Sequence, residues 1–159
     1  YLPRTDSMRL YFRASDDPND SLCEAALDDL TIYGVMAGAT LTATGTATIG
    51  TTVQLDLSAP TFGGEQFYLG VSQTASHGIP IPPAGIAPLD PDPLFFTFQN
   101  APWIFSGFSG ALDGQGAGVS ALNVPADPAL VGLQVFVAGL VLDGSTPAAI
   151  TGGVRLVVP

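Results

Sequence analysis

The sequence contains no lysine, and its only arginines are Arg4, Arg9, Arg13 and Arg155. Residues 14–154 therefore contain no permanently positive side chain. With 14 acidic residues, the chain has a net charge of −10 at neutral pH. A charge of this sign repels phosphate backbones, which argues against nucleic acid as a partner, whereas it attracts cations.

Cysteine, histidine and long apolar runs are also scarce. Cys23 is the only cysteine, so no disulfide can form within the chain and stability must come from the core. We expect Cys23 to be buried or, in an extracellular protein, to pair with another chain. His77 has no second histidine with which to hold zinc. The longest apolar run, 133–142, is interrupted by Gly139 and is too short for a transmembrane helix, so no membrane span is predicted.

The remaining pattern is that of β-strands. Residues 40–49 alternate threonine with small or apolar residues, and the segments 53–57 and 66–72 alternate apolar with mostly polar residues. A period of two predicts strands with one wet face and one dry face. Further strands are predicted at 94–99, 103–109, 116–124, 133–142 and 150–158.

Seven or eight such strands predict an all-β fold, an antiparallel β-sandwich of Ig-like or jelly-roll-like type, over residues 36–159. The segment 133–142 is apolar on both faces, so it should be central or covered by another chain. The six prolines in 76–93 predict an extended surface loop. A capping acid, a proline and a glycine predict one helical turn at 127–132.

The opening segment, 1–35, is predicted to be a separate β-hairpin extension. Two apolar runs, 8–13 and 22–33, are joined by the acidic turn 15–21. A two-stranded hairpin cannot bury its apolar face alone. The segment is therefore either the remnant of a longer domain or an arm that another chain completes, and its start at Tyr1 suits a mature or clipped product.

Two parts of the chain resemble secreted bacterial proteins. FRASDDPNDS (12–21) followed by EAALDDL (24–30) is similar to the closing hairpin of jelly-roll domains in large secreted bacterial proteins. The tail 107–158, with FSGALD, VPADPALVG and a closing GVRL, resembles the C-terminal β-sandwich of secreted or surface proteins of planctomycete-like bacteria. The resemblance implies export and a β-sandwich, but no activity. The earlier strands of the jelly roll are missing here.

The opening segment also contains a candidate metal site. Calcium takes six to eight oxygen ligands, and carboxylates are dense in this stretch. The candidate ligands are Asp16, Asp17, Asp20, Glu24, Asp28 and Asp29. The alternative is a solvated turn whose acids pair with Arg9 and Arg13 across the hairpin. The spacing does not match an EF-hand loop.

Catalytic patterns are weak, and we predict that the chain is not an enzyme. Residues 107–111 begin like a nucleophile elbow but lack its final glycine. Asp90 and Asp92, two residues apart, have no sequence context that would separate their roles. Trp103, with Phe95, Phe96, Phe98 and Phe105 nearby, could form a platform that stacks on sugar rings, and Tyr68 is a further candidate contact. An aromatic core at strand spacing explains the cluster around Trp103 more simply.

Two functions follow from these patterns. The first is an extracellular structural subunit that self-assembles into a surface filament or layer, because strand addition would bury Met8, Leu10 and Phe12 of the arm in a neighbouring copy. The alternative is a non-catalytic carbohydrate-binding accessory module of a secreted hydrolase, which would contact polysaccharide through Tyr68 and Trp103.

Overall fold

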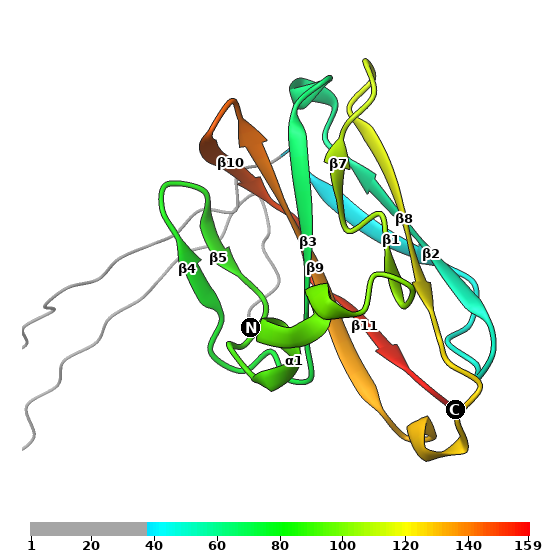
Figure 1. Cartoon of the computed structure of the whole chain (residues 1–159). Helices are drawn as coiled ribbons and strands as arrows, with labels where there is room; N and C mark the ends of the chain where they lie inside the picture. Colours follow the sequence, from blue (N-terminus) through cyan, green and yellow to red (C-terminus); the bar gives the residue numbers. More distant parts are fainter. Residues whose placement is uncertain (1–37) are drawn as a thin grey trace, which may run out of the picture. The chain divides into compact units, whose positions relative to one another are not determined.

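The protein is a β-sandwich of two antiparallel sheets packed face to face, as the sequence predicts (Figure 1). The computed structural model describes residues 38–159. One sheet has the strand order β1 (Thr40–Thr44), β2 (Thr52–Ser58), β8 (Ala117–Asn123) and β6 (Phe105–Ser106). The other has the order β10 (Thr146–Ile150), β9 (Gln134–Asp143), β3 (Gln66–Ser72) and β7 (Ser109–Ala111), and β11 (Val154–Val157) also pairs with β9.

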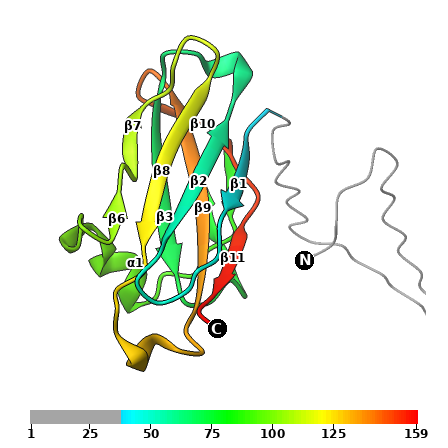
Figure 2. The same ribbon diagram turned by 90° about the vertical axis from the view of Figure 1, so that its right-hand side faces the viewer.

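The core lies between the two sheets, which Figure 2 shows with β2 and β8 in front of β3 and β9. The predicted dry faces are confirmed. Val53, Leu55 and Leu57 of β2 are buried, as are Phe67, Leu69 and Val71 of β3. Alternate residues of a strand point to opposite faces, so these two strands line the same core from opposite sides.

Strand β9 is central, as its two apolar faces predict. It pairs with β3 along one edge and with β10 and β11 along the other. Gly139 lies at the middle of this strand, where a Cβ atom would come within 2.8 Å of Leu57 Cδ1 and 3.1 Å of Leu69 Cδ2. The glycine that interrupts the apolar run therefore permits the close packing of the two sheets.

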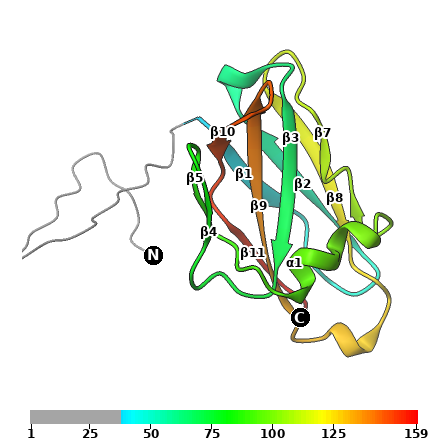
Figure 3. The same cartoon turned by 60° about the vertical axis from the view of Figure 1, so that its left-hand side comes forward.

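A third layer covers part of the outer face of β3 and β9. It consists of the hairpin β4 (Ile79–Ile81) and β5 (Gly85–Ala87), together with the helix α1 (Pro93–Thr97) (Figure 3). The prediction that 76–93 is only an extended loop was therefore wrong in part. Short strands that pair only with each other tolerate proline. Leu140 of β9 is partly buried against the cluster that contains Ala84 and Ala87, so the chain itself covers part of that outer position.

The predicted strand at 94–99 was also wrong. These residues form α1 and the 3-10 turn η2 (Phe98–Asn100). Asp92 accepts a hydrogen bond from the Phe95 N–H through its side chain, and Pro93 occupies the first helical turn. An N-cap acid followed by proline starts a helix whatever the β-propensity of the phenylalanines that follow.

Other predicted elements differ mainly in length. Strand β1 ends at Thr44, because Gly45 has a φ of 102° and the chain turns there. The predicted strand 103–109 divides at Gly107, whose φ is 67°, into β6 in one sheet and β7 in the other. The predicted turn at 127–132 is confirmed as η3 (Pro128–Leu130), with Asp127 as its cap, whereas η1 (Pro60–Phe62) was not predicted.

Candidate functional site

Several predicted site residues lie outside the described residues. The predicted metal ligands are Asp16, Asp17, Asp20, Glu24, Asp28 and Asp29, and the predicted self-association residues are Met8, Leu10 and Phe12. Both sets, like the hairpin extension 1–35 and Cys23, stay predictions. Within residues 38–159, no three His, Cys, Asp or Glu side chains gather closely enough to hold a metal ion.

Tyr68 lines a surface pocket of about 460 Å³. It lies on β3 opposite Ser109 of β7, and 47% of its surface is exposed. The pocket is bounded by the end of η2 and by the segment that joins β6 to β7. We refer to it as the Tyr68 pocket. Its volume is within the range of about 300–1,000 Å³ that is usual for small-molecule sites.

The pocket combines aromatic rings with uncharged polar groups. Besides Tyr68, the rings of Phe98, Phe105 and Phe108 line it. The polar side chains are an amide and two hydroxyls, from Gln99, Ser106 and Ser109, and all three residues are exposed. No charged side chain is part of the lining.

Trp103 does not line this pocket, although its neighbour Pro102 does. It is 70% exposed in the loop before β6. The carbonyl oxygen of Trp103 accepts a hydrogen bond of 2.8 Å from Asn123 Nδ2, and Asn123 Oδ1 accepts one of 2.8 Å from Thr52 Oγ1. The loop is therefore tied to β8 and β2, and the aromatic-core interpretation of Trp103 is not supported.

The phenylalanines behind the pocket do form an aromatic cluster. Phe98 and Phe105 have ring centroids 5.7 Å apart, and Phe105 and Phe108 lie 5.3 Å apart, both pairs edge to face. Phe98 and Phe108 are buried. Packed rings of this kind fix the wall of the pocket, because edge-to-face pairs are favourable beyond their burial.

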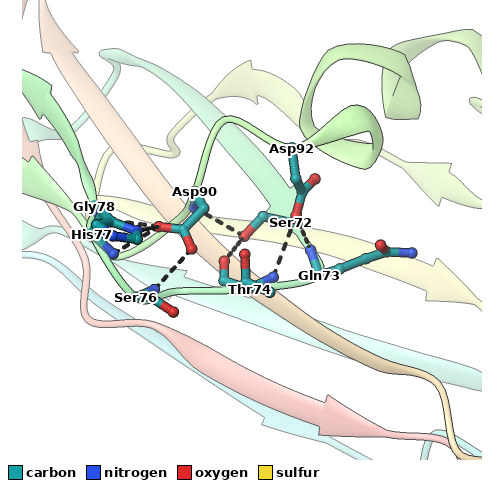
Figure 4. Close-up of polar contacts among 8 residues, drawn as sticks. All are labelled: Ser72, Gln73, Thr74, Ser76, His77, Gly78, Asp90 and Asp92. Carbon is teal, nitrogen blue, oxygen red and sulfur yellow. Dashed lines mark hydrogen bonds and ion pairs between the residues drawn. The ribbon is translucent and has the colours of Figure 1, made fainter.

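Asp90 and Asp92 hold the loop that follows β3 (Figure 4). Asp90 Oδ2 accepts the Ser76 N–H at 2.9 Å, and Asp90 Oδ1 accepts the His77 N–H at 2.8 Å and the Gly78 N–H at 3.2 Å. Asp92 Oδ2 accepts hydrogen bonds from the Gln73 N–H at 2.5 Å and from the Thr74 N–H at 3.3 Å. The pair organises the backbone of this loop, and neither residue lines the Tyr68 pocket.

These donors keep Asp90 ionised. The Thr74 hydroxyl, followed by the N–H groups of Ser76 and His77, holds the pKa of the buried Asp90 far below its ordinary value of 3.8, against the effect of burial. The N–H of Gly78 acts in the same direction. A carboxylate so well supplied with donors is a poor general base, because protonating it would lose these bonds.

The other candidate catalytic residues, His77 and Ser109, do not form a common site. His77 is 88% exposed and its Nδ1 lies 3.9 Å from Asp90 Oδ1. Ser109 lies within β7, paired with Tyr68, and not at the strand-to-helix turn that a nucleophile elbow requires. Its position in the Tyr68 pocket gives it the role of a hydroxyl in the lining.

The sequence patterns indicated Tyr68 but missed Gln99, Pro102 and Ser106. The missed residues depend on the course of the chain from α1 to β6, which the wrongly predicted strand at 94–99 obscured. The helix-start signal Asp92–Pro93 could have revealed this course of the chain.

Among residues 38–159, the structure contains no helix with the length and apolar character of a membrane span.

No family model matches the chain, and no curated protein matches it. The resemblance to secreted bacterial proteins agrees with the antiparallel β-architecture, while the family itself stays a prediction. Function must therefore be inferred from the fold and from the Tyr68 pocket.

Proposed function

We propose that this chain is a non-catalytic binding module of the cell exterior that binds neutral polysaccharide at the Tyr68 pocket. The observation that carries the proposal is the lining of that pocket. Tyr68 offers an exposed aromatic surface beside the amide of Gln99 and the hydroxyls of Ser106 and Ser109. A sugar ring has an apolar face of C–H groups and an edge of hydroxyls, so it suits a site with both kinds of group.

The charge of the chain favours a neutral ligand. The lining of the Tyr68 pocket contains no charged side chain, and the net charge of −10 repels anionic polymers. Trp103 follows Pro102 of the lining in sequence and is 70% exposed, so its ring is available for contact with a longer glycan. The resemblance to secreted bacterial proteins supports an extracellular location, where such polymers occur.

Titration calorimetry against soluble β-glucan, xylan and galactomannan tests this proposal, with polygalacturonate as the anionic control. We expect at least one neutral polymer to bind and the anionic polymer not to bind. Tyr68→Ala should lower the affinity about tenfold or more, equivalent to about 1.4 kcal/mol. Phe96→Ala is the matched control, because Phe96 is also an exposed aromatic residue but lines neither pocket. Equal binding by Tyr68→Ala and the parent would refute the site.

A second candidate function is self-assembly through strand addition. Strand β1 is at the edge of its sheet, with β2 on one side and no strand of the described residues on the other. It presents Thr40, Thr42 and Thr44 to solvent and directly follows the opening segment in sequence. Edge strands are templates for pairing with another chain.

Deletion of residues 1–35 tests this second function. We expect the truncated chain to keep the β-sandwich, as followed by circular dichroism, and to lose any higher-order assembly, as followed by light scattering. Assembly that survives the deletion would exclude the opening segment as the donor. Unfolding of the truncated chain would show that residues 1–35 belong to the main core.

A further inference from the structure

A second pocket, of about 270 Å³, lies between the two sheets at one end of the sandwich. Phe98 of η2, Leu130 of η3 and Leu156 of β11 all line it, and β11 runs toward the lower end of the sandwich in Figure 1. Its inner wall consists of buried apolar residues, among them Ala47, Leu122 and Val135. Thr97 and Pro125, which also line it, are exposed, so the pocket has a mouth that opens to solvent. We refer to it as the inter-sheet pocket.

The inter-sheet pocket offers almost no polar groups to a ligand. Only Thr97 and Asn123 have polar side chains among the residues of the lining. Thr97 Oγ1 donates to the Pro93 carbonyl oxygen at 2.7 Å. Both polar atoms of the Asn123 side chain are used within the chain, by Thr52 and by the Trp103 carbonyl. A polar ligand would therefore lose its bonds to water without replacing them.

An apolar pocket of this size is large enough to hold a small hydrocarbon ligand. Protein interiors are close-packed, and voids larger than a water molecule are few. Apolar cavities of about 150 Å³ stay dry and bind small hydrocarbons such as benzene. From the volume, the apolar lining and the exposed mouth, we propose that the inter-sheet pocket binds the hydrocarbon part of a small uncharged ligand.

Charge sets the selectivity of this pocket. No charged residue lines it. Arg155, the one arginine of the described residues, precedes Leu156 of the lining but is not part of the lining itself, and its Nε donates to Gln134 Oε1 at 2.6 Å. A carboxylate attached to the hydrocarbon is thus disfavoured both by desolvation and by the net charge of −10. The pocket should accept an alcohol more readily than the acid of the same chain length.

The test uses the full chain and the neutral fluorescent probe N-phenylnaphthylamine. We expect saturable binding of the probe and its displacement by decanol at a concentration at least about tenfold lower than by decanoate at neutral pH. Absence of saturable binding, or equal displacement by the two competitors, would overturn the proposal.

Variants that fill the inter-sheet pocket locate the probe. Ala47→Leu adds three carbon atoms at the buried wall, and Ala101→Leu does so at a half-buried position of the lining, in case the first variant fails to fold. Each folded variant should lower the affinity at least about tenfold. Ala117→Leu, an exposed position of β8 outside both pockets, is the matched control and should bind like the parent.

A further variant separates the two pockets. Tyr68→Ala changes the lining of the Tyr68 pocket alone and should leave probe binding unchanged. Unchanged binding by the filling variants, or loss of binding in Tyr68→Ala, would place the probe outside the inter-sheet pocket and refute the inference.

Discussion

The rings of Phe98 and Phe105 meet edge to face, with their centroids 5.7 Å apart and their planes at 86°, and both rings line the Tyr68 pocket and the inter-sheet pocket. This pair is therefore a wall common to the two candidate sites. Phe98 is held by η2, and Phe105 by the short strand β6. The stability of this wall decides whether either pocket keeps its shape.

The first prediction concerns that wall. Phe98→Ala should destabilise the protein by about 3–5 kcal/mol, because it removes a buried ring and leaves a cavity. Phe105→Ala should cost less, since Phe105 is only half-buried. Chemical denaturation measures the stabilities of the parent and of these two variants, with Phe96→Ala as the control. Phe96 is 66% exposed, so its variant should stay within about 0.5 kcal/mol of the parent. A cost for Phe98→Ala no larger than that of Phe96→Ala would contradict the assigned packing.

The second prediction concerns the pH dependence conferred by Asp90. Its pKa in the folded protein is lowered below the ordinary value of 3.8, so ionised Asp90 favours the folded state above that pH. The stabilisation is lost as the pH falls from 3.8 toward the folded pKa. Asp90→Asn should lower the melting temperature at neutral pH, because an amide cannot accept all of the hydrogen bonds from Ser76, His77 and Gly78.

Thermal melts of parent and Asp90→Asn from neutral pH into the acid range measure this effect. The difference between the two proteins should be largest at neutral pH and should shrink below pH 3.8. A constant difference across the whole range would mean that the carboxylate charge contributes nothing. Asp127→Asn, the cap of an exposed 3-10 turn, is the control and should change the melting temperature little.

The sequence predicted those strands in which each face keeps the same surroundings along the whole strand. Val53, Leu55 and Leu57 alternate with exposed residues because β2 lies between solvent and the core. The apolar faces of β9 likewise predicted a central strand. In β2 the alternation of the sequence agrees with the burial of one face, and in β9 the continuous apolar run agrees with a strand that has partners along both edges.

The failures lie where a local signal outweighed the composition. The aromatic run after Asp92 looks like a strand, but the Asp92 side chain and Pro93 start a helix there. Gly107 moves the chain from one sheet to the other, and no hydrophobic period can show such a transfer. The Tyr68 pocket depends on both events, which is why the sequence indicated Tyr68, Phe98 and Phe105 as aromatic candidates but not the polar residues Gln99 and Ser106 beside them.

The third prediction concerns Gly139. A methyl group there would lie 2.8 Å from Leu57 Cδ1 and 3.1 Å from both Leu69 Cδ2 and Thr151 Cγ2. Gly139→Ala should therefore destabilise the protein by about 1–3 kcal/mol through overpacking. Gly152→Ala is the matched control, because a Cβ at Gly152 meets nothing within 4 Å. Urea denaturation distinguishes them, and equal stabilities for the two variants would show that β9 can shift to make room.

The fourth prediction concerns calcium and the acids of the opening segment, which lie outside the described residues. If Asp16, Asp17, Asp20, Glu24, Asp28 and Asp29 supply a site, calcium should stabilise the folded chain by mass action. The gain is about 2.7 kcal/mol when free calcium is about a hundredfold above the dissociation constant. Calorimetry in chelator and in millimolar calcium, at constant sodium, measures it. An unchanged melting temperature would leave the solvated turn as the interpretation.

The fifth prediction concerns the contact between copies. Leu10→Asp or Phe12→Asp should yield monomers with an intact sandwich, because burying an unpaired carboxylate costs several kcal/mol and outweighs the gain from one added strand. Arg9→Ser, at the neighbouring position of the same predicted strand, should do far less, since it would lie on the opposite face. Sedimentation velocity of the three variants decides between them. Assembly that persists in both aspartate variants would exclude the strand 8–13 as the contact between copies. The arrangement to test next would be edge-to-edge pairing between copies of β1. Strand β9 is not available for such pairing, because it already has partners along both of its edges.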